Sequence, residues 1–540
     1  MSTKRLVVVV PGMGSDLSSW TDLLTRLKTE PELADNVTWL QARHNARLTS
    51  FERIETLARN LSADIDVAWR NANGFDEVLL LGHSVGGLIV RQAYLLASGA
   101  GPEEDSTLPW AAAVQRIVLL ASVNRGVNGV DRRGPRPWKY PMLLANWLFR
   151  VFWVLQRLLA YDLMRGSPFI TNLRIQWILH FSNLAAAPKV VQLLGSDDSI
   201  VTRADSIDID QLKLGWHATV PNSNHSNLHR VGDSQYGPAR YTLIRAALLD
   251  DVPAGENAET VQGPRRVVFL LHGIRSGIGA WPTALSRLIG QRFTPQDTEV
   301  IAATYGYFGA IKFALPTTRR QHLPWFQDQY AQCLARNPHA EFIFVGHSNG
   351  TYLFGESLAV IPAMRFHRAV LVASVLPPDY NWAERVRRRQ LHSLCTLRAN
   401  LDWPVGLMCS ALSGLGMRDV GPGGFYGFTN ADQRTTEDLY WYNGGHSKAL
   451  EPGHLSHLVD LLDPPAANPV CQVCAVTNTS PPAWFSTLSR IAKPLALPVV
   501  AVVAALLALA CHAIFIAGAA FAIPALLALA VAAVVIVDVV

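Results

Sequence analysis

The stretch LLLGHSVGG at residues 79–87 decides the fold, and FIFVGHSNG at residues 342–350 repeats its pattern. In each stretch an apolar run typical of a buried β-strand leads into Gly-His-Ser-x-Gly, and an apolar segment typical of a helix follows. A serine between glycines is weak evidence alone, because so short a pattern recurs by chance. In the order strand, turn, helix, however, the glycines let strand and helix approach closely while the serine occupies a strained turn. The context predicts two nucleophile elbows, with Ser84 and Ser348 as the nucleophiles.

The similarity between the two halves extends beyond the serine motif. RLVVVVPGMGSDLSSWTDLLTRL from Arg5 and RVVFLLHGIRSGIGAWPTALSRL from Arg266 align without a gap, and IVLLASV ending at Val123 matches AVLVASV ending at Val375. Three matched blocks in one order predict a tandem duplication. Each copy alternates strand-like runs with longer amphipathic segments, which predicts a mainly parallel sheet flanked by helices.

Composition shifts along the chain predict its organisation. Residues 251–264 are polar and carry proline and glycine, as a linker does, and a second such stretch follows the second copy. We expect a first α/β domain at residues 1–250 with an insertion at about 124–188, and a second at 265–462 after the 251–264 linker. Another linker at 463–494 leads to two membrane-spanning helices at 495–540.

The apolar tail predicts membrane attachment. Residues 495–540 are almost wholly apolar and long enough for two crossings of about twenty residues each, with Gly518 between them. Arg490 and Lys493 immediately precede the first crossing, which favours a cytoplasmic position for both repeats. At the other end, residues 6–10 are too short for the apolar region of a signal peptide, so we expect a first buried strand there.

Composition excludes several classes of protein. The chain of 540 residues is long enough for two or three domains, and its net charge of +5 comes with no basic stripe interleaved with aromatic residues, so no nucleic-acid surface is expected. Six cysteines form no disulfide framework and indicate a reducing compartment. Cys471 and Cys474 make a single Cys-x-x-Cys that lacks the further ligands of a structural zinc, so no metal is expected.

Both repeats, over roughly residues 1–462, resemble the α/β-hydrolase superfamily. The first-strand turns VVPGMG and LLHGIR, the elbows GHSVG and GHSNG, and later acid and histidine segments carry the resemblance, although Pro11 stands where the second copy has His272. The resemblance implies cleavage of carboxylic esters, lipid or other acyl esters among them, through an acyl-serine and without a cofactor. It does not separate esterase from thioesterase, amidase or acyltransferase. Serine at the elbow argues against the dehalogenase and epoxide-hydrolase branches, which use aspartate there.

A serine hydroxyl needs a histidine to take its proton and a carboxylate to orient that histidine. In this fold the chain order is serine, acid, histidine. In the first repeat, KVVQLLGSDDSIV at residues 189–201 offers Asp198, which the resemblance favours, with Asp197 as the alternative. VPNSNHSNLHR at residues 220–230 offers His225, with His229 as its competitor.

The second repeat offers the same order of groups. ANLDWPV at residues 399–405 supplies Asp402, and YNGGHSKAL at residues 442–450 supplies His446. His454 and His457 lie so close to the following linker that too little chain remains for a closing helix. The second predicted triad is therefore Ser348, Asp402 and His446.

The oxyanion that forms during acyl transfer needs backbone N–H donors, one after the nucleophile and one after the first inner strand. These positions are Val85 with Met13 in the first repeat, and Asn349 with Ile274 in the second. His83 and His347 are not expected to act as bases, because a residue adjacent to the serine projects in another direction.

The repeats differ most in the insertion of the first one. PWKYPMLLANWLFRVFWVLQRLLAYDLMRGS at residues 137–167 is aromatic with basic and polar interruptions, which suits a helix at a membrane interface and predicts a lid over the first site. A helix packed between the repeats is the alternative. The aromatic residues on which the lid prediction depends are Trp147, Phe149, Phe152 and Trp153. The rival to an enzyme is a membrane scaffold in which one or both repeats are inactive binding modules.

Overall fold

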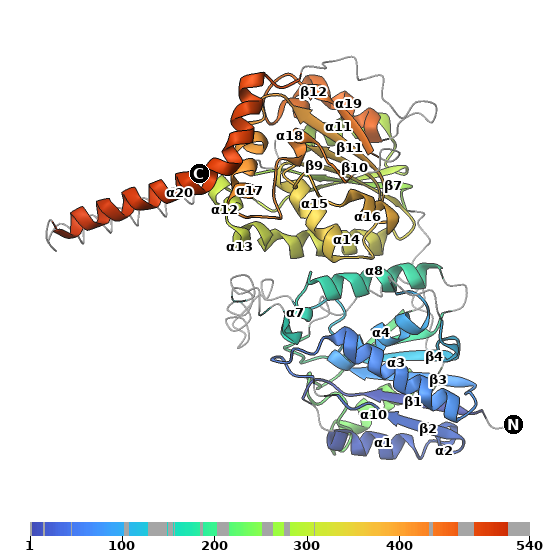
Figure 1. Cartoon of the computed structure of the whole chain (residues 1–540). Coiled ribbons are helices and arrows are strands. Elements are labelled where there is room, and N and C mark those ends of the chain that lie inside the picture. The colour runs from blue at the N-terminus through green and yellow to red at the C-terminus, as the bar shows by residue number, and fades with distance from the viewer. Residues whose placement is uncertain are drawn as a thin grey trace. The chain divides into compact units, whose positions relative to one another are not determined.

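The computed structural model describes most of the chain: residues 3–14, 17–44, 46–101, 107–127, 148, 155, 157–183, 187–201, 215–250, 263–274, 281–306, 308–430, 436–462 and 480–516. The chain forms two compact units (Figure 1). Unit 1 comprises Met1–Gln262 and Pro324–His339, and unit 2 comprises Gly263–Leu323 and Ala340–Val540.

Unit 1 contains a six-stranded, wholly parallel sheet. Its strands are β1 (Arg5–Val10), β2 (Val37–Gln41), β3 (Glu77–His83), β4 (Val114–Leu120), β5 (Lys189–Gly195) and β6 (Gly215–Val220). They lie in the order β2-β1-β3-β4-β5-β6, with Val8 of β1 opposite Leu40 of β2 and Leu80 of β3. The elbow serine thus follows a strand in the middle of the sheet.

Helices cover both faces of this sheet, which explains its uninterrupted apolar strands. Leu6, Val8 and Val10 pack in one core with α3 (Ile54–Asn71), α4 (Val85–Ala97) and α8 (Pro168–Asn183), whereas Val7 and Val9 pack in another with α1 (Thr21–Leu27) and α10 (Gly237–Leu249). Alternate residues of one strand therefore serve opposite cores. The shorter helices of this part are η1 (Leu17–Trp20), α2 (Pro31–Ala34), α5 (Pro109–Ala112) and α7 (Leu159–Asp162).

Unit 2 repeats the sheet. The strands β7 (Arg266–Leu271), β8 (Thr298–Ala303), β9 (Glu341–His347), β10 (Phe366–Val372), β11 (Leu391–Ala399) and β12 (Thr436–Tyr442) lie in the order β12-β11-β10-β9-β7-β8, again all parallel. In chain order this is the arrangement of unit 1. The prediction of two parallel-sheet α/β domains is confirmed.

The remaining helices of the second half begin with α11 (Trp281–Arg292), which packs against α19 (Leu455–Leu462). The others are α12 (Ala310–Ala314), α13 (Pro316–Arg319), η4 (Arg320–His322), α14 (Leu323–Arg336), α15 (Asn349–Val360), α16 (Trp382–Arg387), the π-helix η5 (Pro404–Cys409), α17 (Ser410–Gly414), α18 (Gly423–Tyr426), η6 (Lys448–Leu450) and η7 (Pro452–His454). The helix α14 precedes β9 in the chain, yet nearly all of it belongs to the compact unit 1. The compact units therefore do not follow the simple order of the two repeats.

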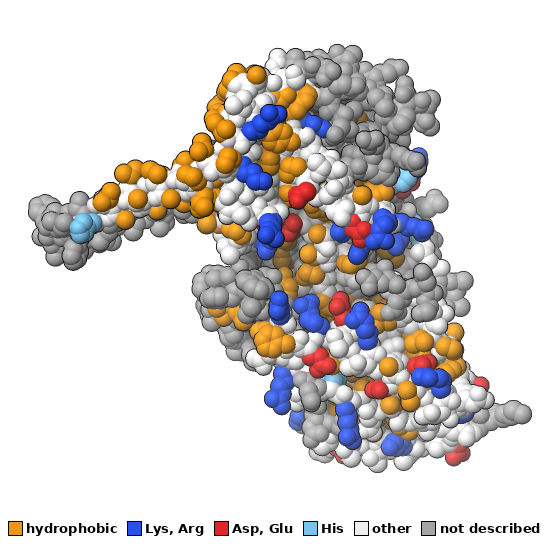
Figure 2. Space-filling model, viewed as in Figure 1, with side chains coloured by type: hydrophobic (Ala, Val, Ile, Leu, Met, Phe, Trp, Pro, Cys, Tyr) orange, Lys and Arg blue, Asp and Glu red, His pale blue; other side chains and the backbone are white. Residues whose placement is uncertain are grey.

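The chain's last described element is the long helix α20 (Ala483–Ile516), which contains Pro494 and Pro498. It bends after its first turns and leaves unit 2 as a projecting rod (Figure 1). Residues Ala483–Leu506 are long and apolar enough to cross a membrane, and hydrophobic side chains cover the projecting part (Figure 2). Among the described residues this is the one helix of that kind. The second predicted crossing falls in residues 517–540, which lie outside the described residues.

The helix α20 begins inside the segment predicted as a linker, and its first half is docked. Phe485 is fully buried, and Ser489 donates to the Gly406 carbonyl at 2.5 Å and accepts from the Tyr426 hydroxyl at 2.7 Å. A Cβ added at Gly414 would lie 2.0 Å from the Lys493 carbonyl oxygen, so the two backbones touch there. Residues 483–496 are part of unit 2.

Two other predictions fall partly outside the described residues. The 251–264 linker is described only at residues 263 and 264. Of the aromatic insertion at residues 137–167, Trp147, Phe149, Phe152 and Trp153 all lie outside the described residues. Its described part supplies α7, and α8 follows it within the wider insertion predicted at about 124–188.

Candidate active site

Both elbow serines have the strained backbone expected of a nucleophile elbow. Ser84 joins β3 to α4 with φ 54° and ψ −120°, and Ser348 joins β9 to α15 with φ 52° and ψ −121°. A positive φ is unfavourable for a residue with a side chain, so the surrounding packing must enforce it. The two turns agree within 2° in φ, which makes them the same structure.

The glycines after each serine allow helix and sheet to meet. A Cβ added at Gly86 would lie 2.3 Å from the Val10 carbonyl oxygen, and one at Gly350 would lie 2.5 Å from that of Leu271. No side chain fits at such distances. Each helix therefore begins directly against the end of the first strand of its unit, where the predicted oxyanion loop starts.

In unit 1 the three predicted catalytic side chains form one hydrogen-bonded chain. His225 Nε2 lies 2.8 Å from Ser84 Oγ, and His225 Nδ1 lies 3.0 Å from Asp198 Oδ2. The other oxygen of Asp198 accepts the backbone N–H groups of Ile200 and Val201, both at 2.8 Å. These bonds fix the carboxylate, which in turn orients the imidazole toward the serine.

The alternatives within unit 1 lie elsewhere. Asp197 is exposed and accepts from Ser196, whereas the Asp198 side chain is buried against His225. His229 is buried, stacks on Trp20 with ring centroids 4.7 Å apart, and lies 3.1 Å from Ser19 Oγ. Burial lowers the pKa of His229 to about 4, so this imidazole stays neutral beneath the site.

The histidine that precedes each serine is hydrogen-bonded to the backbone of the predicted catalytic histidine. His83 Nε2 lies 2.8 Å from the carbonyl oxygen of His225, and His347 Nε2 lies 3.2 Å from that of His446. A carbonyl can only accept, so Nε2 carries the proton in each case. Burial holds the pKa of both rings well below the usual value, which keeps them neutral donors. Sequence reasoning excluded them as bases but gave them no role.

Unit 2 brings together the acid and the histidine, and differs at the serine. His446 Nδ1 lies 2.8 Å from Asp402 Oδ1, which also accepts the Val405 N–H at 3.0 Å. Asp402 is fully buried. Among the described residues, however, His446 Nε2 and Asp402 Oδ2 have no hydrogen-bond partner. The link from histidine to Ser348 that unit 1 has is thus not formed in unit 2.

The other two histidines weighed for unit 2 lie away from Asp402. His454 Nδ1 bonds the Lys448 carbonyl at 3.0 Å, and its ring packs against Tyr442 and His457. Neither ring has a hydrogen bond to Asp402, whose imidazole neighbour is His446. His446, the histidine predicted from the sequence, is thus the one that contacts Asp402.

The predicted oxyanion donors flank each serine. Val85 and Asn349 are the first residues of α4 and α15, where backbone N–H groups lack intrahelical partners. Met13 and Ile274 each follow a glycine that lies under the nucleophile, because a Cβ at Gly12 would be 3.2 Å from Ser84 Cβ and one at Gly273 would be 2.7 Å from Ser348 Cβ. In both units one predicted donor is thus the first residue of the helix after the serine and the other lies in the loop after the first strand, as expected of an oxyanion hole.

One further polar contact is made to the loop after the first strand of each unit, which carries a predicted oxyanion donor. His44 Nε2 lies 2.9 Å from the Pro11 carbonyl oxygen, and the Tyr305 hydroxyl donates to the His272 carbonyl oxygen at 2.9 Å. Tyr305 also accepts from the Asn349 side chain at 3.0 Å. The two units use different residue types for the same contact, so comparing the repeats in the sequence could not have found them.

No metal centre accompanies these groups in the part of the chain that the structure describes. There, no three or more histidine, cysteine or acidic side chains are grouped as metal ligands would be. Cys333, Cys395 and Cys409 are buried and form no disulfide among the described residues, whereas Cys471 and Cys474 lie outside them.

Comparison with protein families gives one match. Residues 1–108, which run from β1 through the elbow of Ser84, match the family described as "Putative serine esterase (DUF676)". None of the curated proteins compared matches this chain.

Solved structures similar to this chain include α/β-hydrolases. The peroxisomal alpha-beta-hydrolase Lpx1 of Saccharomyces cerevisiae is 14% identical, with 48% of this chain and 80% of that chain covered and a TM-score of 0.29. The product of gene lin2722 from Listeria innocua is also 14% identical (48% and 97% covered, TM-score 0.31). Phospholipase PlaB from Legionella pneumophila is 15% identical, with 36% of this chain and only 38% of that chain covered and a TM-score of 0.25. Similarity at this level says nothing about substrate.

The family match over residues 1–108, together with the two parallel sheets and their serine turns, supports the α/β-hydrolase superfamily.

Proposed function

We propose that the protein is a membrane-anchored serine hydrolase that cleaves carboxylic esters of lipids or other acyl compounds through an acyl-serine intermediate. The observation that carries the proposal is the hydrogen-bonded chain from Ser84 through His225 to Asp198 in unit 1. The match of residues 1–108 to a serine-esterase family supports the same chemistry.

The reaction would proceed in two halves at the first site. His225 Nε2 takes the proton of Ser84 Oγ as that oxygen attacks the ester carbonyl, and Asp198 stabilises the resulting imidazolium. The N–H groups of Val85 and Met13 hold the oxyanion. His225 then protonates the leaving alcohol, which departs and leaves the acyl group on Ser84. A water activated by the same histidine releases the acid and restores the serine.

For unit 2 the proposed triad is Ser348, Asp402 and His446, with Asn349 and Ile274 as oxyanion donors. Its acid and histidine are in contact, and a hydrogen bond between His446 Nε2 and Ser348 Oγ would complete it. Catalytic hydrogen bonds often tighten only when substrate is bound. The two sites arose, in this proposal, by duplication of one domain, with domains at residues 1–250 and 265–462.

A second candidate function applies to unit 2. The unpartnered Nε2 of His446 and Oδ2 of Asp402 favour a hydrolase-like module that binds an acyl ligand or a partner at the membrane without turnover. In that case only the first unit would be an enzyme, and the second would be the scaffold.

Membrane attachment is proposed for α20 beyond its docked turns. Residues 497–516 would span about 30 Å at about 1.5 Å per residue, the thickness of a bilayer's hydrocarbon core. Leu497, Leu506 and Leu509 are more than half exposed, as a lipid-facing helix would be. A second crossing within residues 517–540 would return the C-terminus to the same side. Arg490 and Lys493 favour the cytoplasm for both units. The insertion at about 124–188 is proposed as a lid at the membrane surface.

The proposal is tested by ester hydrolysis. Purified full-length protein in detergent is assayed on p-nitrophenyl esters of increasing acyl length, with Ser84→Ala, Ser348→Ala and the double variant alongside. We expect Ser84→Ala to lose most of the activity and the double variant to lose all of it. Activity in the double variant equal to that of the parent would overturn the proposal. If Ser348→Ala leaves the activity unchanged and Ser84→Ala abolishes it, the second unit is the binding module.

A further inference from the structure

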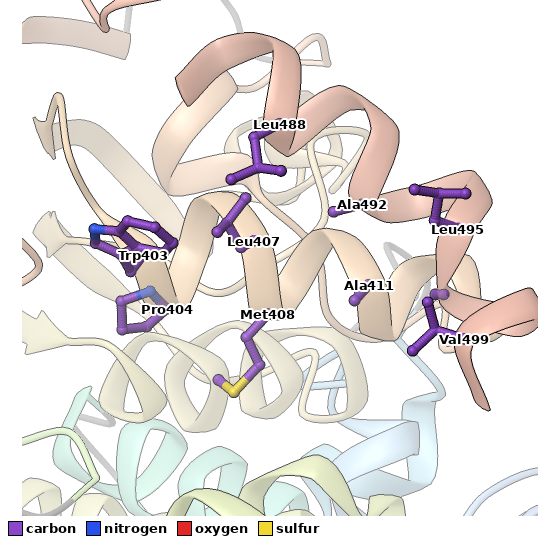
Figure 3. Close-up of a pocket in the computed structure, with 10 residues that line it drawn as sticks. Trp403, Pro404, Leu407, Met408, Ala411, Leu488, Ala492, Leu495 and Val499 are labelled. Carbon is purple, nitrogen blue, oxygen red and sulfur yellow. The ribbon is translucent and has the colours of Figure 1, made fainter. Parts of the chain in front are cut away.

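An apolar groove lies in unit 2 between the first half of α20 and the helical segment Pro404–Gly414. It has a volume of about 600 Å³, within the usual range for ligand sites, and only apolar residues line it (Figure 3). The helical segment contributes Trp403, Pro404, Leu407, Met408 and Ala411, and α20 contributes Leu488, Ala492, Leu495, Ala496 and Val499.

Contacts at two places join the two helices that form the groove. Near one end, the Gly406 carbonyl accepts from Ser489, and a Cβ at Gly406 would lie 3.2 Å from the ring of Phe485. Near the other end the backbones of Gly414 and Lys493 touch. Because the two helices are joined at two places, their position relative to each other is fixed in the folded unit. The groove is therefore preformed.

Its walls present apolar surface that nothing in unit 2 covers among the described residues. Trp403 is 51% exposed, Leu495 is 49% exposed and Val499 is 55% exposed. Because these side chains are about half exposed, covering them with an apolar group removes apolar surface from water, which is favourable. An apolar occupant is therefore favoured, and the absence of charged or polar lining residues excludes recognition of a headgroup.

The course of α20 identifies the occupant. Leu495, Ala496 and Val499 line the groove and also belong to the stretch that is apolar enough to enter a membrane. The groove therefore runs beside α20, from Trp403 on the opposite wall to the part of α20 that would enter the bilayer. Trp484, at the start of the same helix, is 57% exposed, and tryptophan is enriched where protein meets the membrane surface.

We infer that this groove holds one hydrocarbon chain of a membrane lipid, drawn from the leaflet next to which unit 2 lies. The inference rests on the proposed membrane attachment and is independent of catalysis at either serine. It assigns a use to Trp403, which follows the acid Asp402 directly in the chain. A lipid chain in the groove would contact the segment that carries the second site's carboxylate.

The test is photo-crosslinking in vesicles. Full-length protein is reconstituted into phosphatidylcholine vesicles that contain a small share of phosphatidylcholine with a diazirine near the end of one acyl chain, isolated by flotation, irradiated and digested. Adducts are then mapped by mass spectrometry. We expect adducts on the peptide that carries residues 403–411 as well as on the projecting part of α20.

A matched pair of variants separates the groove from general membrane contact. Ala411→Trp fills the groove and should abolish the adducts on residues 403–411 while those beyond Leu497 persist. Thr487→Trp places the same side chain at an exposed position of α20 that does not line the groove, and should leave both sets unchanged.

Three outcomes would overturn the inference. Adducts confined to α20 beyond Leu497 in the floated parent protein would show that lipid does not enter the groove. Photo-leucine introduced at Leu407 that cross-links to residues 517–540 in place of lipid would show that the chain's own tail fills it. Failure of the protein to float would overturn the membrane attachment and the groove together, whereas ester hydrolysis would still report on the proposed chemistry.

Discussion

The docking of α20 beside Asp402 leads to a prediction that distinguishes the two sites. Phe485 is fully buried and packs against Trp403 and Phe425, with ring centroids 5.3 Å and 5.4 Å away. Its ring also lies over Gly406, whose N–H donates to the Asp402 carbonyl at 2.8 Å. The helix α20 therefore packs on the turn that begins at Asp402, the acid proposed for the second site.

Phe485→Ala should loosen this docking and weaken the second site alone. Removing a fully buried phenylalanine costs about 3–5 kcal/mol, because both the burial and the packing are lost. At about 1.4 kcal/mol for each factor of ten, the ratio of docked to undocked helix falls by a factor of about 10² to 4 × 10³. The π-helix after Asp402 then loses its support, and His446 loses a fixed partner. Trp484→Ala, at an exposed neighbour, should cost at most about 1 kcal/mol.

The measurement is the rate of fluorophosphonate labelling of each serine, with the other serine changed to alanine, in full-length protein in detergent. Phe485→Ala should slow the labelling of Ser348 and lower the melting temperature of unit 2, without slowing that of Ser84. If Ser348 does not label even in the parent, the melting temperature becomes the readout. An unchanged Ser348 rate together with an unchanged melting temperature would refute the structural role of α20.

Three further predictions concern unit 1. His83→Ala removes the donor to the His225 carbonyl, so we expect kcat at the first site to fall by about tenfold with KM little changed. This corresponds to the loss of one buried hydrogen bond of about 1–1.5 kcal/mol. A tenfold rise in KM with kcat unchanged would contradict a positioning role. His229 has its pKa lowered from 6.5 to about 4 on folding, so between these pH values the unfolded chain binds a proton that the folded unit does not, and stability should decrease as pH falls through this window by up to about 3 kcal/mol. Urea unfolding at pH values from 7 to 4 measures this decrease in stability, and the stability of His229→Phe should depend less on pH. An equal decrease in His229→Phe would show that other groups cause it. Asp198→Asn should reduce the labelling rate of Ser84 by several orders of magnitude, whereas Asp197→Asn should change it by no more than about twofold. The reverse result would show that Asp197, and not Asp198, is the acid.

The sheets and the elbows could be predicted because their signals are local. The apolar run 6–10 has no alternation, which indicates a strand buried on both faces, and the structure shows alternate residues serving two cores. The positions of Ser84 and Ser348 follow from glycines whose Cβ atoms would overlap neighbouring backbone. The choice of Asp198 over Asp197 needed the fold, since only the geometry of the loop after β5 shows which side chain turns toward His225.

Features that depend on distant contacts could not be predicted. Phe485 and Gly406 are far apart in the sequence, so a segment with the composition of a linker gave no sign that it docks beside Asp402. The grouping of most of α14 with unit 1 is likewise a tertiary effect. The missing hydrogen bond at His446 Nε2 distinguishes two sites whose motifs look equivalent in the sequence.

The central claim, that Ser84 is an activated nucleophile, is tested most directly by mapping covalent adducts. Full-length protein is treated with a fluorophosphonate, digested, and analysed by mass spectrometry beside His225→Ala and Ser84→Ala variants. We predict an adduct on Ser84 in the parent, none at that peptide in Ser84→Ala, and a labelling rate in His225→Ala lower by several orders of magnitude, since the serine then has no base. Absence of an adduct on Ser84 in folded parent protein, or equal labelling of the parent and His225→Ala, would contradict the account.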